Sequence, residues 1–596
     1  MTSYPCKLKI VLRLLTASVC FILPLHAQTS QTNMLLAYWA LDSTAPPTPV
    51  HTTYGWNVVA HANPDECFYG LSDPTDSLNT IKNLNNYSFI GAYPNDLSPA
   101  VLARCTSGTT RAGQPKINQA YVWGLTVNGS DVWFSTVANT LCLVLDGYYG
   151  AAPNATLTSD YVCDYKNNAF EDFKPARMYV YNATTQTLTD LTPKVYPTDA
   201  NLVAPMWTNY VYGLRSAGNY GGVVFFGGLN LTGSVVMFAF NSASKAYLGS
   251  YVFDGKNGHM GPYTNIRQWH VYNGQLYTGV ATPTGGQILR WTGSASSPWS
   301  FAIVGNIGGD PAYFTLHSDN HIYVSTWPVN LNLSSTMSVW MSPGLHGYPA
   351  QLTTSDAPLW KSVWNLSQYE VEPSAVQGGG AIISYGGYLY FGTMHVPGTG
   401  LVAFNAIYPN APKTSDAEEA AFLGSYRPIV IFRSKGAVNG NLPVQLLYGN
   451  LFLPKFNSST NTWSLVLNNL MQFGIYGTAG FGNFFNNYTW AAEVYNNQLF
   501  FGTMDFSYLT NGALQGIPAF IQSRAQSSYG ADLWYFTSTS KPAALIDGNG
   551  LGNITSYGIR NLVAGPDRMW VGMANPMNLR SDQTNNPGGW KLLQFK

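Results

Sequence analysis

Charged side chains are scarce in this sequence, since Asp, Glu, Lys and Arg together make up 10% of its 596 residues. The 29 basic and 29 acidic residues cancel, so the formal net charge is +0 at pH 7. A protein that binds a phosphate backbone needs clustered Lys and Arg, and this composition offers no such cluster. We therefore expect no nucleic acid partner.

Long apolar runs are also lacking after the N-terminus. The first residues carry basic side chains up to Arg13, then an apolar run to Leu25 and a small-residue exit at Ala27, which is typical of a secretory signal peptide. An uncleaved anchor is the weaker alternative, because the uncharged run is shorter than the roughly 20 residues that span a bilayer. We expect a signal peptide at 1–27 and a secreted or periplasmic protein without membrane insertion.

Cysteine is rare too, and two of the six cysteines fall in the predicted signal peptide. The other four are Cys67, Cys105, Cys142 and Cys163. Four cysteines allow three pairings, and disulfides suit an exported chain, so the simplest expectation pairs the nearest neighbours, Cys67 with Cys105 and Cys142 with Cys163. None of the spacings is C-x-x-C, so we expect no metal site and no cofactor.

What the sequence does contain is aromatic residues (14%), 58 glycines and a short repeat. Runs of hydrophobic, aromatic, hydrophobic and small residues recur seven times. They are VWFST at Val132, VFFGG at Val224, LYTGV at Leu276, IYVST at Ile322, LYFGT at Leu389, LFFGT at Leu499 and MWVGM at Met569. Most follow a turn signal such as NG, GG or NN, so each run is predicted to be the second strand of a β-hairpin.

This repeat resembles the seven-bladed β-propeller superfamily in architecture, because three to four antiparallel strands follow one another in each unit. We expect an all-β fold of four-stranded antiparallel blades with long inserted loops. Residues 121–596 would form the blades, and residues 28–120 would contribute loops and ring closure, with MLLAYWALD from Met34 as the closing strand. The alternatives are a pair of β-sandwich domains, or an eighth blade hidden between residues 404 and 480.

The resemblance implies that the first strand of each blade lines a central channel. The positions nine residues before the seven runs should then form one ring around it, and they are Trp123, Arg215, Arg267, Tyr313, Gly380, Trp490 and Arg560. Three arginines in one register would gather positive potential, which suits an anionic or polyhydroxylated ligand, and the aromatic residues offer faces for sugar rings. All but Gly380 are the predicted ligand-binding residues. The alternative is that the arginines pair with neighbouring strand groups.

Polar residues near the ends of the hairpins are weaker candidates for catalysis. His395 and Asp505 follow second strands, as do Trp327 and Asn575, and Glu493 lies three residues beyond Trp490. His395 with Asp505 or Glu493 could exchange protons as general acid and base. The alternative is that these residues cap separate turns, since no motif fixes their mutual distance.

Two functions follow from these patterns. The first is an exported, non-catalytic propeller that binds a glycan or an extracellular protein on its loop face. The second is a glycoside hydrolase or polysaccharide lyase that acts on an acidic saccharide at the channel mouth, with the three arginines holding its carboxylate. WD, kelch and Asp-box signatures are not repeated, so the activities of those families do not carry over.

Overall fold

The structure is a computed structural model that describes residues 30–39, 49, 54–63, 66–68, 114–138, 140, 175–195, 211–230, 232–329, 335–510, 519–576 and 586–596. The predicted signal peptide lies outside these ranges. Cys67 falls in the short strand β2 (Glu66–Phe68), which pairs with β3 (Gln114–Lys116), but Cys105, Cys142 and Cys163 lie outside the described residues. The disulfide pairing therefore stays a prediction.

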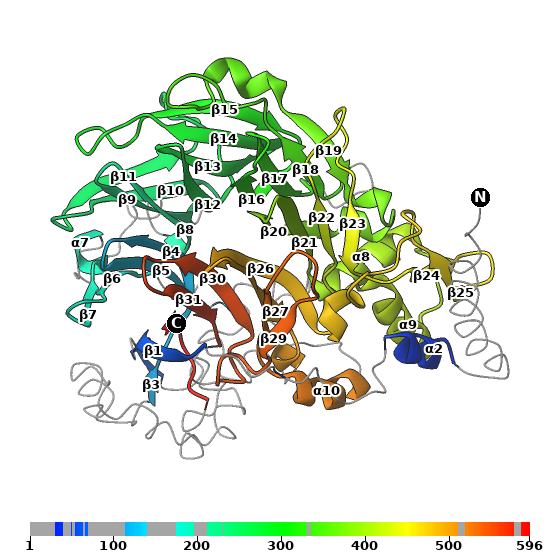
Figure 1. Cartoon of the computed structure of the whole chain (residues 1–596). Coiled ribbons are helices and arrows are strands. Elements are labelled where there is room, and N and C mark those ends of the chain that lie inside the picture. Colours follow the sequence, from blue (N-terminus) through cyan, green and yellow to red (C-terminus); the bar gives the residue numbers. More distant parts are fainter. Residues whose placement is uncertain are drawn as a thin grey trace.

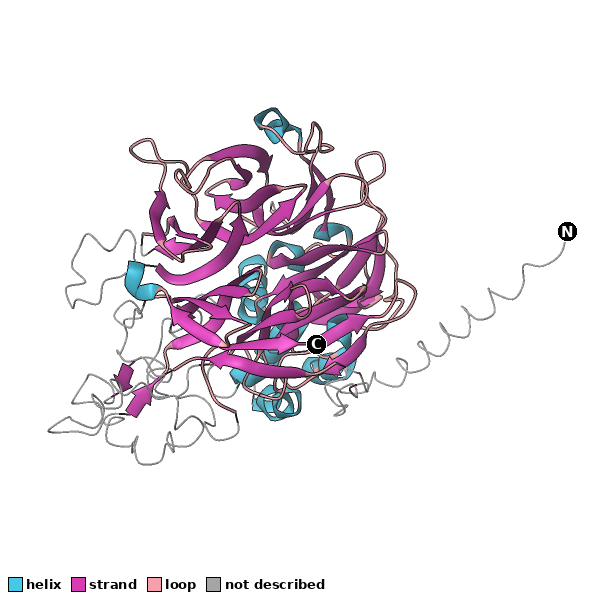
Figure 2. Cartoon of the chain, turned by 60° about the vertical axis from the view of Figure 1, so that its left-hand side comes forward, coloured by secondary structure: helices cyan, strands magenta, loops and turns pink. Residues whose placement is uncertain are grey.

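Antiparallel strands dominate the described chain (Figure 2), and they pair in groups of consecutive neighbours. The first group is β4 (Gln119–Asn128), β5 (Asp131–Ala138), β6 (Met178–Asn182) and β7 (Thr187–Asp190). The second is β8 (Val211–Tyr220), β9 (Val223–Asn230), β10 (Val235–Asn241) and β11 (Tyr247–Phe253). The third is β12 (Asn265–Tyr272), β13 (Gln275–Thr282), β14 (Gly285–Trp291) and β15 (Phe301–Ile307).

The same pairing continues along the rest of the chain. The fourth group is β16 (Asp310–Leu316), β17 (Ile322–Trp327), β18 (Ser338–Met341) and β19 (Lys361–Asn365). The fifth is β20 (Gln377–Tyr385), β21 (Tyr388–His395), β22 (Ile431–Ser434) and β23 (Gln445–Tyr448). The sixth is β26 (Asn486–Tyr495), β27 (Gln498–Asp505), β28 (Leu533–Phe536) and β29 (Ala544–Asp547). The last contains β30 (Gly558–Ala564), β31 (Met569–Ala574) and β32 (Lys591–Phe595).

The first strands of these groups lie around a common centre. Each contacts the first strand of the next group, in the order β4, β8, β12, β16, β20, β26 and β30, and β30 contacts β4 in turn. Figure 1 shows these strands nearest the centre, with later strands such as β7, β11, β15 and β19 towards the outside. The chain therefore has the β-propeller architecture that its repeat resembles, and it is mostly β.

The small residue in each repeated run has a packing role. It lies against the first strand of the following group. A Cβ atom added at Gly502 would be 2.4 Å from Cγ2 of Ile559, and one added at Gly572 would be 2.7 Å from Cγ1 of Val122. Where the residue is serine, as at Ser325, its hydroxyl donates to the Gly380 carbonyl over 2.7 Å. Neighbouring sheets thus approach closely at this position, which explains why the run repeats.

The strand that joins the last group is β1 (Trp56–His61), which pairs antiparallel with β32. The prediction that MLLAYWALD forms this strand is wrong. Its first residues belong to the helix α2 (Gln31–Tyr38), which Ser30 caps by accepting a hydrogen bond from the Asn33 N–H. Met, Leu and Ala favour a helix as readily as a buried strand, and the cap decides between them.

Helix α2 packs against an insertion between β21 and β26 (Figure 1). The Trp39 indole donates to the Leu423 carbonyl over 2.9 Å, and the Trp463 N–H donates to Gln31 Oε1 over 2.6 Å. The insertion contains α8 (Pro397–Ile407), α9 (Ser415–Ser425) and the hairpin β24 (Phe452–Asn457) and β25 (Thr462–Leu467). Since β24 and β25 pair with each other alone, residues 404–480 hold no eighth four-stranded sheet. Two further short helices are α7 (Thr192–Val195) and α10 (Ala519–Ala525).

The attachment of β1 makes a testable contribution to stability. The Trp56 indole donates to the Leu551 carbonyl over 3.0 Å and stacks on Phe595 with ring centroids 6.4 Å apart. Because the Trp56 side chain is half-buried, Trp56→Ala is expected to lower the free energy of unfolding by about 2 kcal/mol. The measurement is urea unfolding followed by circular dichroism.

The matched control is Val58→Ala on the same strand, where the side chain is 46% exposed. This change is expected to stay within about 0.5 kcal/mol of the unchanged protein. Equal effects of the two substitutions would show that β1 contributes little through the Trp56 contacts.

Candidate functional site

Every first strand carries a β-bulge at the same place. The register with the second strand shifts between Val122 and Gly124, and equivalent shifts occur in the six other groups. At each shift, one or two residues of the first strand have no register partner on the second strand. In five groups this is one residue: Trp123, Arg215, Ala312, Trp490 or Arg560. In the other two groups it is a pair: Arg267 with Gln268, and Gly380 with Ala381. A bulge redirects a side chain out of the strand's alternation. The nine-residue spacing therefore marks the bulge, and Tyr313 follows it by one residue.

The side chains at these bulges surround one cavity of about 310 Å³. All six residues predicted to bind a ligand line it: Trp123, Arg215, Arg267, Tyr313, Trp490 and Arg560. Val137, Leu229 and Met394, which lie near the ends of second strands, line it too, so the cavity lies at the end of the sheets where first strands begin. The predicted convergence of these residues is found in the structure, while their binding role stays a prediction.

Each arginine of the cavity stacks on a tryptophan. The distances from guanidinium carbon to ring centroid are 5.0 Å for Arg215 on Trp123, 5.2 Å for Arg267 on Trp327 and 5.6 Å for Arg560 on Trp490. Stacking fixes the plane of the guanidinium group, so its N–H edges have defined directions. Trp327 was expected on a loop, but it ends β17 and lines the cavity.

Two of the arginines are joined through polar side chains. Arg267 forms an ion pair with Asp310, with Nη2 2.7 Å from Oδ2. The Asn265 amide donates to the same carboxylate oxygen over 2.7 Å and accepts from Arg215 Nη1 over 2.9 Å. Asp310 thus neutralises the charge of Arg267, and Asn265 bridges Asp310 and Arg215 through two hydrogen bonds.

Arg560 has a different environment. It is 2% exposed, and among the described residues no carboxylate forms an ion pair with it. Its Nη1 lies 3.5 Å from the Tyr313 hydroxyl and its Nη2 lies 3.4 Å from the Arg215 carbonyl, both long for charged donors. Burial, and then the nearby charge of Arg267, lowers the pKa of Arg560 against the opposing effect of Tyr313. The guanidinium group therefore lies in the cavity without a full counter-charge.

Glycines on the next first strand make room for two of the tryptophans. A Cβ atom added at Gly213 would be 1.9 Å from Cζ3 of Trp123, and one added at Gly558 would be 2.2 Å from Cζ3 of Trp490. These glycines lie two residues before Arg215 and Arg560. Tyr121, Asn265 and Tyr488, which also line the cavity, occupy the equivalent places in other groups. The sequence analysis missed these three residues, although a step of two along each first strand leads to them.

His395 and Asp505 end their second strands but do not line the cavity. His395 is fully buried and accepts from the Arg427 N–H over 2.9 Å, and burial together with the Arg427 charge lowers its pKa to about 3. Asp505 is also fully buried and accepts from the Ser507 N–H and the Asn483 amide, each over 2.7 Å. Burial raises the pKa of Asp505 well above its usual range. Both side chains are enclosed by the loops that follow their strands.

Glu493 lies at the other end of the same hairpin. It pairs with Phe500, whereas Asp505 pairs with Asn486. The five residue steps from Phe500 to Asp505 span about 17 Å at about 3.4 Å per residue. Glu493 and Asp505 therefore lie too far apart for both carboxyl groups to act on one reacting atom, while the catalytic role predicted for His395 with either of them stays a prediction. A polar residue near a strand end does not reveal which end of the sheet it occupies.

The remaining polar candidates are bound internally. Asn575 is fully buried, and its amide donates to the hydroxyls of Thr555 and Ser556 over 3.1 Å. Among the described residues, no group of three or more His, Cys, Asp or Glu could hold a metal ion. No described helix has the length and apolarity to span a membrane.

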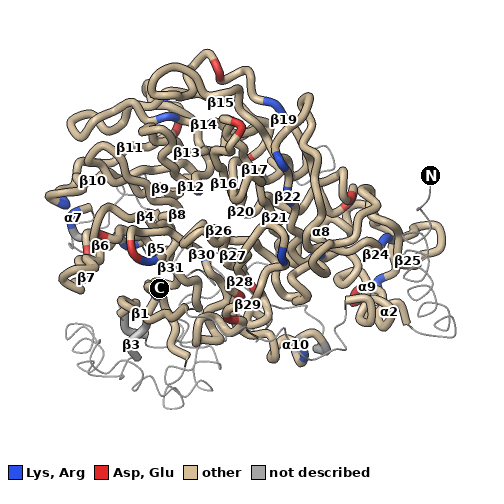
Figure 3. The backbone as a smooth tube through the Cα atoms, viewed as in Figure 1, with Lys and Arg blue, Asp and Glu red and all other residues tan. Residues whose placement is uncertain are grey.

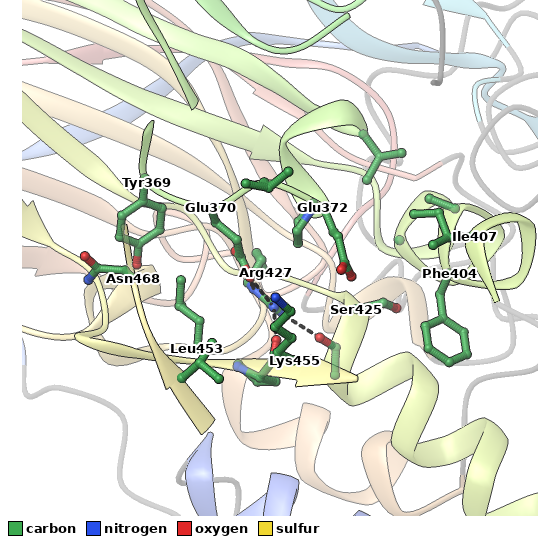
Figure 4. Close-up of a pocket in the computed structure, with 18 of the residues that line it drawn as sticks. Tyr369, Glu370, Glu372, Phe404, Ile407, Ser425, Arg427, Leu453, Lys455 and Asn468 are labelled. Carbon is green, nitrogen blue, oxygen red and sulfur yellow. Dashed lines mark hydrogen bonds and ion pairs between the residues drawn. The ribbon is translucent and has the colours of Figure 1, made fainter. Parts of the chain in front are cut away.

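A second cavity, of about 100 Å³, lies between the insertion and the segment 369–376. Figure 4 shows Glu370 and Arg427 together within it. The pair is 2.6 Å apart, and Arg427 also donates to the carbonyls of Gly424, Tyr426 and Pro454. Burial opposes the Arg427 charge, but Glu370 outweighs it and raises the pKa of Arg427. This buried arginine is fully satisfied within the protein, in contrast to Arg560.

Charges elsewhere in the described chain lie scattered, mostly on outer strands and loops (Figure 3). The three arginines around one cavity are therefore a local concentration of charge, in a chain in which charged residues are few overall.

Comparisons with known proteins found no matching family model and no matching curated protein. Solved structures with some similarity include polysaccharide lyase Uly1, at 8% identity and a TM-score of 0.37, covering 92% of this chain and 99% of that one. The propeller domain of the trilobed protease from Pyrococcus furiosus has 8% identity and a TM-score of 0.30, covering 74% and 87%. The exo-β-1,3-galactanase from Phanerochaete chrysosporium has 12% identity and a TM-score of 0.28, covering 59% and 67%.

Glu493 makes the stability of the fold depend on pH. Burial raises its pKa from 4.5 to about 7, against hydrogen bonds from the Val494 and Ala564 N–H groups. The folded state favours the protonated form, so this contribution to stability is present below about pH 4.5 and is lost as the pH rises through about 7. Thermal melting between about pH 5 and pH 8 should show a smaller decline for Glu493→Gln than for the unchanged protein. Parallel melting curves for the two proteins would contradict this account.

Proposed function

We propose that the seven groups of strands form a closed seven-bladed propeller with four strands in each blade. The cyclic order of contacts between first strands supports closure, as does the approach of Gly572 in the last group to Val122 in the first. The last blade takes its fourth strand, β1, from the N-terminal side of the chain. Joining strands from both parts of the chain in one sheet closes the ring without leaving β32 as a free edge.

We propose that this propeller binds an anionic, hydroxyl-rich ligand, an acidic glycan, in its central cavity. The observation that carries the proposal is Arg560, a buried guanidinium group that lines the cavity and has no carboxylate partner among the described residues. A buried donor without a good partner costs about 1–3 kcal/mol, and more when it is charged. A ligand carboxylate at Arg560 would remove this cost and form a charge-assisted, bidentate pair.

The rest of the cavity suits the remainder of such a ligand. Asn265 and the Tyr313 hydroxyl can exchange hydrogen bonds with sugar hydroxyls, and Trp123, Trp327 and Trp490 exclude water behind the arginines. The signal-like N-terminus supports a secreted or periplasmic location, where glycans are available as partners. Binding a protein on the loop face is the other partner class, but a cavity of about 310 Å³ favours the smaller ligand.

Arg560→Gln tests the binding site. Titration calorimetry with oligogalacturonate is expected to show an affinity loss of about 30-fold or more, because the variant removes one side of a buried charge pair. The neutral methyl ester of the same oligomer should bind the unchanged protein as weakly as the acid binds the variant.

The matched control is Arg290→Gln on β14, because Arg290 does not line the cavity. Its Nη1 donates a hydrogen bond of 2.8 Å to Gln275 Oε1. This variant should retain the full affinity. Unchanged affinity in Arg560→Gln, with both variants folded, would contradict the site.

The second candidate function is a polysaccharide lyase. It is favoured by the Tyr313 hydroxyl, which lies 3.5 Å from Arg560 Nη1 and donates to the Trp490 carbonyl. Arg560 would stabilise the charge that develops on a uronate carboxylate. Tyr313, after its hydroxyl has lost its own proton to solvent, would take the proton from C5 and then donate it to O4 of the departing sugar. The electron pair of the C5–H bond forms the C4=C5 double bond as the C4–O bond breaks. Hydrolysis is less favoured, because no Asp or Glu is among the described residues that line the cavity, and glycosidases use two carboxyl groups about 5–9.5 Å apart.

An activity assay separates binding from elimination. If the protein is a lyase, oligogalacturonate should yield an unsaturated product that absorbs ultraviolet light. Tyr313→Phe should then abolish the product and keep the affinity within about threefold, since it removes one hydroxyl that is not charged. A folded protein that binds the oligomer and forms no product is a binding protein and not a lyase.

A further inference from the structure

We infer that the cavity recognises two successive acidic residues of one oligosaccharide, and not a single acidic sugar. This inference rests on the proposed function and concerns the same site. Its basis is a repeated arrangement of tryptophan, glycine and arginine, which occurs twice and which we name the first cradle (Trp490, Gly558 and Arg560) and the second cradle (Trp123, Gly213 and Arg215).

The two cradles are built alike. In each, the tryptophan is the bulged residue of one first strand, and the glycine and arginine belong to the first strand of the next group. The tryptophan lies over the glycine, where no Cβ would fit, and the arginine stacks on the tryptophan at 5.6 Å in the first cradle and 5.0 Å in the second. The sequences agree as well: YTW with GIR in the first cradle, and YVW with GLR in the second.

The cradles also adjoin one another. The Tyr121 ring contacts the Trp490 ring at 5.8 Å and the Trp123 ring at 6.3 Å, both edge to face. On the other side, the Nη2 group of Arg560 reaches the Arg215 carbonyl at 3.4 Å. A single aromatic wall therefore backs both arginines, and the two arginines belong to the same cavity.

This geometry suits a repeating ligand. A stacked guanidinium group presents its N–H edge in a fixed direction, and the arginines of both cradles line the cavity, with Arg215 Nη1 donating in addition to Asn265 over 2.9 Å. An oligomer whose successive sugars each carry a carboxylate can engage both edges in one binding event. The second contact is then intramolecular and raises the affinity without a second loss of translational freedom.

The third arginine does not extend this series. Arg267 stacks on Trp327, but Asp310 already neutralises it at 2.7 Å, and Asn265 stands where the cradles have glycine. The inference is therefore limited to two acidic residues.

The experiment compares galacturonic acid with its α-1,4-linked dimer and trimer by titration calorimetry on the full mature chain. The dimer is expected to bind at least tenfold more tightly than the monomer, and the trimer no more than about threefold more tightly than the dimer. Arg215→Gln should remove the advantage of the dimer over the monomer, whereas Arg560→Gln should weaken the binding of both ligands. Arg215→Lys, which keeps the charge but not the planar fork, should retain part of the advantage.

The outcomes distinguish the two proposals. Equal affinity of monomer and dimer in the unchanged protein would overturn the two-residue inference and leave the anion site at Arg560 intact. A dimer advantage that survives in Arg215→Gln would also overturn it. Failure of every uronate to bind would overturn the proposed function itself. Thermal melting identifies a variant that does not fold, and the comparison of ligands on the unchanged protein decides the question without any variant.

Discussion

The β-bulge in each first strand is the constraint on which the site depends. A regular strand turns successive side chains to alternate faces, where they pack between sheets. The bulge adds one or two residues at an equivalent place in every group, and Arg215 and Arg560, at two of these bulges, reach one cavity from different sheets. The close packing between neighbouring sheets at Gly502 and Gly572 fixes the positions of the bulges relative to one another.

The buried arginines of this protein differ in how their positive charge is compensated. Arg427 has Glu370 and three carbonyls, and Arg267 has Asp310, so neither depends on an outside group. Arg560 has an aromatic face and two long contacts instead. In a chain with so few charges, this difference distinguishes a structural arginine from one that is available to a ligand.

The sequence was sufficient for the cavity residues, because six of the seven positions that lie nine residues before the repeated runs belong to a bulge of the first strand, and Tyr313 directly follows the seventh bulge. It was not sufficient for Asp310, whose contacts with Arg267 and Asn265 cross between sheets and leave no periodic signal. Met34 and the residues after it were expected in a strand because short apolar runs fit either structure, and the Ser30 cap was overlooked. The separation of Glu493 from Asp505 could not be predicted either, because proximity in the chain does not tell one end of a hairpin from the other.

The pairing of β1 with β32 also has a consequence for folding during synthesis. His61 ends β1, and Lys591, which begins β32, follows it by 530 residues (591 minus 61). At about 5–20 residues per second, a ribosome needs roughly 30–100 s to cover that distance. During this time the β1 segment has no partner strand, so its backbone N–H and C=O groups are unpaired and can bond to another chain. The pairing of β1 with β32 can therefore form only when the last strand has been synthesised.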